Sequence, residues 1–111
     1  MEIRSSDNRL RIGTTEIETP YAIREVLESQ KLFLVLFEPR SSVELKRNIS
    51  AFDRSGEEVW LIEKTAYEGS PRDPFMHMWL EDGKLYADSW EGVTYEVDLD
   101  TGAIEPLRWC K

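Results

Sequence analysis

The chain is organised around one apolar run, Leu32-Phe33-Leu34-Val35-Leu36-Phe37. Because side chains along an extended segment alternate between two faces, this run presents hydrophobic groups on both faces. Such a pattern is typical of a strand that is buried on both sides, and the run is far shorter than the roughly 20 residues of a membrane span. We therefore expect residues 32–37 to form a strand inside the core.

A helix over about residues 20–29 is predicted to pack on one face of this strand. Thr19 can cap its amino terminus, and Pro20 suits the first helical position because its missing N–H would be unpaired there in any case. A helix of this length is not stable alone, so it must bury an apolar stripe against the strand. The residues at helical spacing that form this stripe are Ala22, Ile23, Val26 and Leu27.

From residue 47 onward the sequence has the pattern of successive hairpins. Asp82-Gly83, between two alternating segments, is the strongest short signal for a hairpin turn. The predicted fold class is mainly β (α+β): an antiparallel β-meander of about six to eight strands with one short helix packed on it, in a single domain over residues 1–111. The segments with strand character outside the apolar run are 9–12, 15–18, 48–53, 58–63, 74–81, 84–90, 93–99 and 103–109.

Two stretches of this region, residues 48–60 and 83–102, share a pattern. In the first, Asp53 ends a strand, a turn containing Gly56 follows, and the next strand delivers Trp60. Residues 47–109 thereby resemble the blade repeat of quinoprotein-type β-propellers, and the whole chain resembles small uncharacterised bacterial proteins with a similar hairpin series. The resemblance implies that the tryptophan docks between neighbouring sheets, and it implies no catalytic or cofactor-binding residue.

Composition excludes several classes of protein. The 111 residues are 41% hydrophobic and 11% aromatic, which is enough for a core and argues against disorder. The amino terminus lacks an apolar signal region, so a cytoplasmic location is expected. The single cysteine, Cys110, cannot form an internal disulfide or a multi-cysteine metal site, and no metal or cofactor is predicted.

The charge is unevenly distributed along the chain. The net charge is −8; residues 1–55 contain nine acidic and nine basic side chains, whereas residues 56–111 contain 13 and five. An acidic surface repels phosphate, so neither nucleic acid nor an anionic membrane is expected as a partner. A basic protein would be attracted instead.

Three short features of the sequence could carry chemistry. Asp100-Thr101-Gly102 is similar to an aspartic-protease turn, but Asp-Thr-Gly is also a common hairpin turn, which is the interpretation we favour. The run from Asp98 to Gly102 could begin a calcium loop, but a turn stabilised by side-chain oxygens is the interpretation we favour. His77 could act as a general base, but no motif supplies a nucleophile for it, and a partly buried or interfacial histidine is favoured.

Acidic and aromatic residues coincide on one predicted hairpin and the turn after it. If Leu85 and Ala87 point into the core, then Tyr86, Asp88 and Trp90 are exposed together. The alternative is that the two aromatic residues are themselves core residues, or are merely docked on a neighbouring strand. Exposed aromatic side chains surrounded by carboxylates are typical of binding hot spots for Lys- and Arg-rich partners. The predicted partner-binding residues are His77, Trp79, Glu81, Asp82, Tyr86, Asp88, Trp90 and Glu91.

The sequence therefore predicts a small, non-enzymatic, acidic binding protein that recognises a basic protein partner. One concrete form is an immunity-type inhibitor of a toxin domain. The alternative hypothesis is a small ligand-binding or hydrolytic domain that uses His77 and nearby carboxylates. Self-association through sheet edges is a further structural alternative.

Overall fold

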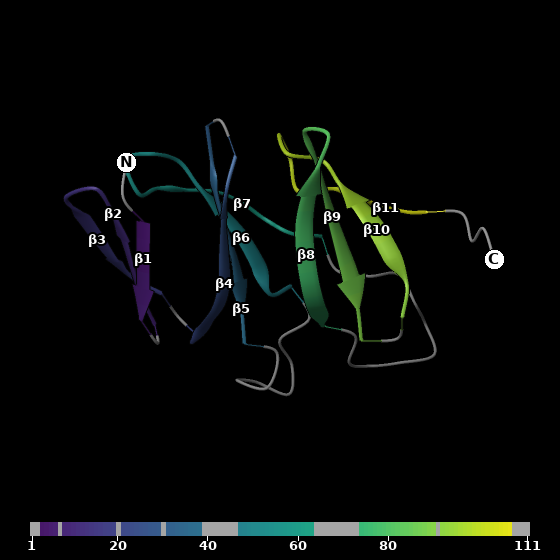
Figure 1. Cartoon of the computed structure of the whole chain (residues 1–111), viewed down its shortest axis with the longest axis horizontal. Helices are drawn as coiled ribbons and strands as arrows, with labels where there is room; N and C mark the ends of the chain where they lie inside the picture. The colour runs from purple at the N-terminus through teal and green to yellow at the C-terminus, as the bar shows by residue number, and fades with distance from the viewer. Residues whose placement is uncertain are drawn as a thin grey trace.

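The fold consists of three antiparallel sheets. The computed structural model describes residues 3–6, 8–19, 21–29, 31–38, 47–63, 74–90 and 92–107, with residues 3–6 described by their backbone alone. These residues form eleven strands, and within each sheet the strands that are hydrogen-bonded neighbours are also consecutive in sequence. Figure 1 shows the sheets side by side, from β1–β3 at the left to β8–β11 at the right.

Each sheet is thus a meander. The amino-terminal sheet contains β1 (Ile3–Ser6), β2 (Arg9–Ile12) and β3 (Thr15–Glu18). The central sheet contains β4 (Ile23–Glu28), β5 (Phe33–Phe37), β6 (Ile49–Phe52) and β7 (Glu58–Leu61). The carboxyl-terminal sheet contains β8 (Phe75–Glu81), β9 (Lys84–Ser89), β10 (Thr94–Val97) and β11 (Ile104–Pro106).

Strand β5 separates two hydrophobic clusters, which confirms the prediction that residues 32–37 hold a strand buried on both sides. Phe33, Val35 and Phe37 pack with residues of the amino-terminal sheet. Leu34 and Leu36 point the other way, into a larger cluster shared with the carboxyl-terminal sheet. Full burial of a side chain of this kind contributes about 1.5–3 kcal/mol, so β5 alone supplies a large part of the hydrophobic stabilisation.

The predicted helix over about residues 20–29 is wrong. Residues Ile23–Glu28 form strand β4, which pairs with β5 so that Val26 lies opposite Val35. The physical reason is that β5 is fully buried, so its backbone N–H and C=O groups need partners along both edges. A strand supplies these partners and a helix does not, and this requirement overrides the apolar stripe at helical spacing. Among the described residues there is no helix, and hence none long and apolar enough to cross a membrane.

The predicted hairpins are largely confirmed. Asp82 and Gly83 have φ angles of 52° and 77°, as a two-residue hairpin turn between β8 and β9 requires. The last predicted strand is shorter than expected, because β11 ends at Pro106. Residues 64–73 and 108–111, with Cys110, lie outside the described part of the chain.

Side chains of the central sheet and its flanking residues, among them Asn48 and Trp60, join it to the carboxyl-terminal sheet. The Asn48 amide is fully buried; its Nδ2 donates to the carbonyls of Phe37 and Phe75, and its Oδ1 accepts from the Phe75 N–H at 2.8 Å. The Trp60 indole lies over Gly102, and its Nε1 donates to the Leu99 carbonyl at 2.8 Å. These contacts fix the carboxyl-terminal sheet, and therefore its solvent-facing side, relative to the core.

Candidate functional site

The side of the carboxyl-terminal sheet that faces away from the core carries the predicted binding residues. Leu85 and Ala87 of β9 are fully buried, so Tyr86 and Asp88 point to the opposite side. This arrangement confirms the condition under which the hairpin would present its acidic and aromatic groups together. We call the side chains on this side the outer face; they are His77, Trp79, Glu81, Lys84, Tyr86, Asp88, Thr94, Glu96 and Glu105.

A bulge interrupts the alternation of side chains in β8. Simple alternation would place Phe75 on one face with His77 and Trp79, but Phe75 is fully buried and His77 is exposed. The reason is a bulge between residues 75 and 77, which lets Phe75 face Ser89 while His77 faces Asp88. An extra residue in one strand reverses the alternation from that point on.

Trp79 and Tyr86 form the aromatic centre of the outer face. They lie opposite each other on β8 and β9, and their rings are stacked with centroids 5.7 Å apart and an angle of 23° between the planes. Both side chains are half-buried, so Tyr86 is not a core residue; its ring instead docks on Trp79 of the neighbouring strand, which was part of the alternative interpretation. Stacked aromatic pairs form rigid apolar platforms that lose little entropy when a partner covers them.

Trp90 follows β9 and is also exposed. Its side chain is 63% accessible to solvent, although the backbone N–H donates to the Pro74 carbonyl at 2.8 Å. The alternative in which Trp90 is a core residue is therefore wrong. Glu91, the next predicted binding residue, lies outside the described part of the chain.

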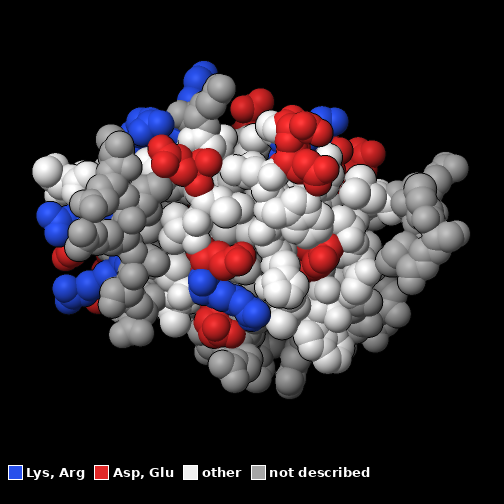
Figure 2. Space-filling model, viewed as in Figure 1, with Lys and Arg blue, Asp and Glu red and all other residues white. Residues whose placement is uncertain are grey.

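Carboxylates surround the aromatic pair. Residues 74–107 contain eight acidic side chains and one basic side chain, Lys84. Glu81 and Asp82 are exposed at the β8–β9 turn, and Glu105 is exposed on β11. Figure 2 shows red side chains gathered over this upper right end of the molecule, while blue side chains lie mainly at the left, over the amino-terminal sheet. The two ends of the protein therefore differ in electrostatic potential.

Two further acidic groups of the outer face have specific partners. Asp88 Oδ1 accepts a hydrogen bond of 2.6 Å from the Thr94 hydroxyl. Glu96 forms an ion pair with Lys84, with a distance of 3.9 Å between the oxygen and Nζ. Thr94, Glu96 and Glu105 were missed as site residues, although the alternation of polar and apolar residues along 94–97 was a sufficient signal for the first two.

His77 and the groups opposite it do not have the arrangement of a nucleophilic triad. His77 lies opposite Asp88, but the only hydroxyl in this row of the sheet, on Thr94, donates to Asp88. In a nucleophilic triad the imidazole lies between the hydroxyl and the carboxylate. Here the carboxylate of Asp88 lies between His77 and the Thr94 hydroxyl, so the order differs. Within the described ranges, His77 forms no hydrogen bond or ion pair.

The two turn motifs near the carboxyl terminus are structural. Asp98 Oδ1 accepts from the Asp100 N–H at 2.8 Å, and the Gly102 N–H donates to the Asp98 carbonyl at 2.8 Å, which closes the turn between β10 and β11. Asp100-Thr101-Gly102 is therefore the hairpin turn that we favoured. In the part of the chain that the structure describes, no three His, Cys, Asp or Glu residues are grouped to hold a metal ion.

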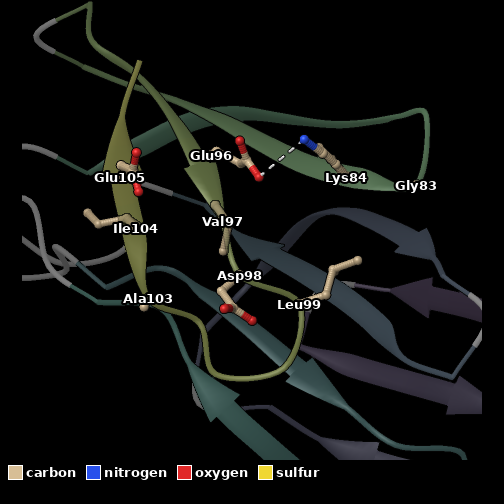
Figure 3. Close-up of a pocket in the computed structure, with 9 residues that line it drawn as sticks. All are labelled: Gly83, Lys84, Glu96, Val97, Asp98, Leu99, Ala103, Ile104 and Glu105. Carbon is tan, nitrogen blue, oxygen red and sulfur yellow. Dashed lines mark ion pairs between the residues drawn. The ribbon is translucent and has the colours of Figure 1, made fainter. Parts of the chain in front are cut away.

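A groove of about 380 Å³ borders the outer face at this end of the sheet. Figure 3 shows Lys84 and Glu96 reaching toward each other, with Glu105 on the neighbouring strand and Asp98 in the turn that follows β10. Leu99 and Ile104 contribute apolar surface to the same groove. The groove thus combines carboxylates with apolar walls, and one cation of the protein itself lies in it.

Comparison with known proteins identifies the family of the chain but assigns no activity to it. A family model described as "Domain of unknown function (DUF7957)" matches residues 1–109. No curated protein and no solved structure matches the chain.

Proposed function

We propose that this chain, which belongs to the DUF7957 family, is a small non-enzymatic binding protein that recognises a basic protein partner through the outer face of its carboxyl-terminal sheet. The observation that carries the proposal is the stacked Trp79–Tyr86 pair within a surface that has many carboxylates and a single lysine. Aromatic side chains that can be desolvated supply most of the affinity of such interfaces, and surrounding charges supply specificity and rapid association.

Binding accounts for this surface better than catalysis does. The outer face is a sheet surface whose polar groups are spread along four strands, and the Thr94 hydroxyl donates its hydrogen bond to Asp88. An excess of carboxylates favours a Lys- and Arg-rich surface and disfavours nucleic acid and anionic lipid, which carry phosphate. The partner class that fits the charge is therefore a basic protein.

An immunity-type inhibitor is the concrete form that we favour. A protein that neutralises a basic toxin domain must associate quickly and cover a cationic surface, and charge complementarity accelerates association by orders of magnitude. The strongly acidic carboxyl-terminal half and the nearly neutral amino-terminal half fit a protein that presents one end to its partner. We place this activity in the cytoplasm.

The test is affinity capture from native lysate at low and then high salt, followed by identification of the captured proteins. The outer-face variant carries Glu81→Lys and Glu105→Lys, two exposed positions on β8 and β11. The control variant carries Glu18→Lys and Glu57→Lys, which are exposed elsewhere and change the net charge equally. We expect the wild type and the control to capture the same basic protein, and the outer-face variant to lose it.

Two results would contradict the proposal. One is that the outer-face variant captures the protein as well as the control does, which would place the binding site elsewhere. The other is that no basic protein is captured by the wild type at low salt. Circular dichroism of each variant would show that the substitutions leave the fold intact, because all four positions are exposed.

A further inference from the structure

The groove beside the outer face already contains a cationic side chain of the protein itself, that of Lys84. Lys84 Nζ lies 3.9 Å from Glu96, and both side chains line the groove. The Lys84 side chain is 58% exposed and that of Glu96 is 40% exposed, so the pair is solvated and weak. A cation from another molecule could therefore replace Lys84 at small cost.

The other residues of the groove also favour the binding of a cationic side chain. Glu105 lies directly opposite Glu96 on the neighbouring strand, which places two carboxylates side by side. Leu99 and Ile104 line the groove with apolar surface, against which an alkyl chain can pack. A long side chain with apolar methylene groups and a cationic head satisfies both requirements.

Arginine fits these carboxylates better than lysine does. Its planar guanidinium has five N–H donors in a fixed arrangement and can bind two carboxylates at once, whereas an ammonium group is a compact point charge with a stronger hydration shell. The groove is also next to Tyr86, because Tyr86 faces Glu96 across β9 and β10. An arginine in the groove would thus sit at the margin of the aromatic pair.

We infer that this groove is the anchor site for one arginine side chain of the basic partner, and that Lys84 is a built-in competitor for that site. The inference rests on the proposed function and adds the residue type that the partner inserts. Lys84 then adds a small cost that every partner cation must meet to reach Glu96; a guanidinium that also binds Glu105 offsets this cost better than a single ammonium group does.

The experiment uses the whole chain, labelled with ¹⁵N, and the short peptide acetyl-Gly-Arg-Gly-amide. We expect saturable shifts of the amide signals of residues 96–105. The same peptide with citrulline, which has the shape of arginine without its charge, should give none, and the lysine peptide should bind more weakly. Lys84→Gln should tighten arginine binding about two- to fivefold, the size expected from removal of one exposed ion pair.

Matched variants separate the groove from general charge effects. Lys31→Gln removes one exposed positive charge outside the groove, and it should leave the affinity for the arginine peptide nearly unchanged. Glu105→Gln should weaken arginine binding, whereas Glu81→Gln, on the same face but outside the groove, should not. Equal effects of the two lysine variants, or of the two glutamate variants, would overturn the inference.

The failure of this inference is distinguishable from the failure of the proposed function. If the arginine peptide does not saturate, or binds no better than its citrulline or lysine counterpart, the anchor site is wrong. Capture of a basic protein that depends on Glu81 and Glu105 would still support the binding face. If the peptide saturates the groove but capture is independent of these residues, the groove binds arginine, but the proposed function fails and with it the role of the groove as the partner's anchor site.

Discussion

Trp79 and Tyr86 stack across β8 and β9, with their ring centroids 5.7 Å apart, on the side of the sheet that faces away from the core. An aromatic pair in this position contributes little to core packing, because the fully buried residues Leu85 and Ala87 occupy the other side of the same strand. The pair is thus a surface feature, and its removal should affect binding more than stability.

The first prediction concerns this pair. Trp79→Ala should weaken binding of the captured partner by at least about tenfold, since buried aromatic residues at an interface centre contribute roughly 2 kcal/mol or more. The free energy of unfolding should fall by only about 1 kcal/mol, because stacking contributes about 0.5–1.5 kcal/mol beyond burial. Isothermal titration calorimetry and urea unfolding measure the two effects separately.

Val59→Ala is the control for this substitution. Val59 is an apolar residue on β7 that is 46% exposed and lies outside the carboxyl-terminal sheet. It should leave the affinity unchanged. A loss of affinity similar to that of Trp79→Ala would show that any exposed apolar residue contributes and that the stacked pair is not special.

The second prediction concerns the contact between Trp60 and Gly102. A methyl group at position 102 would lie 2.5 Å from a Trp60 ring carbon, and the φ of 79° there already disfavours a side chain. Gly102→Ala should therefore lower the free energy of unfolding by about 2–4 kcal/mol, through strain and overpacking. Denaturant unfolding monitored by tryptophan fluorescence measures this loss.

Gly83→Ala separates backbone strain from the Trp60 contact. Gly83 has a φ of 77°, but a methyl group there meets nothing within 4 Å. This variant should lose only about 1–2 kcal/mol, the cost of a left-handed conformation for one residue with a side chain. If both glycine variants are destabilised equally, Trp60 does not pack as described.

The third prediction concerns Asn48. Asn48→Ala leaves the buried Phe75 N–H and the carbonyls of Phe37 and Phe75 without the partner that the amide provides. Because each unsatisfied buried group costs about 1–3 kcal/mol, the variant should lose about 3 kcal/mol or more. Ser50→Ala, which removes a buried hydroxyl that makes a single hydrogen bond to the exposed Glu58, should cost less. Comparable losses in thermal unfolding would contradict the role assigned to Asn48.

The fourth prediction is a pH dependence. The Ser55 hydroxyl, together with the N–H groups of Glu57 and Ser55, donates to Asp53 and lowers the pKa of this carboxyl below its ordinary value of 3.8. A lowered pKa in the folded state favours folding above the unfolded-state pKa, and this contribution disappears as the pH falls through the folded-state pKa. The stability that Asp53 adds is therefore present near neutral pH and lost below 3.8.

Unfolding measured from neutral pH to below 3.8 checks this expectation. Asp53→Asn should be less stable than the wild type near neutral pH, and the difference should shrink as the acid range is entered. Asp82→Asn serves as the control, since Asp82 lies exposed at the β8–β9 turn. A difference between Asp53→Asn and the wild type that is constant with pH would contradict the lowered pKa.

Much of the sheet structure follows from local signals. The apolar run at residues 32–37 predicted the buried strand β5, and Asp82-Gly83 predicted the β8–β9 turn. Both signals are local, since alternation and turn chemistry depend on residues close in sequence. Trp60 packs against Gly102 of the neighbouring sheet, which is the type of contact that was predicted for it. The resemblance to propeller blades stays a prediction.

The predictions that were wrong concern features that depend on contacts between residues far apart in the sequence. Residues 23–28 have an apolar spacing that suits a helix, but the unpaired edge of β5 makes them a strand. The bulge between Phe75 and His77 accompanies the burial of Phe75, whose ring packs against that of the distant Tyr95 with centroids 5.8 Å apart. The groove depends likewise on the pairing of β10 with β11, which brings Glu96 opposite Glu105.

The most direct test of the central claim is a footprint of the bound state by amide hydrogen exchange. The captured partner is added to the full chain, and exchange is compared with and without it, strand by strand. The proposed function predicts that protection rises in β8–β11, around Trp79, Tyr86 and Glu96, and stays unchanged in β2 and β3. Protection confined to the amino-terminal sheet, with β8–β11 unaffected, would contradict it.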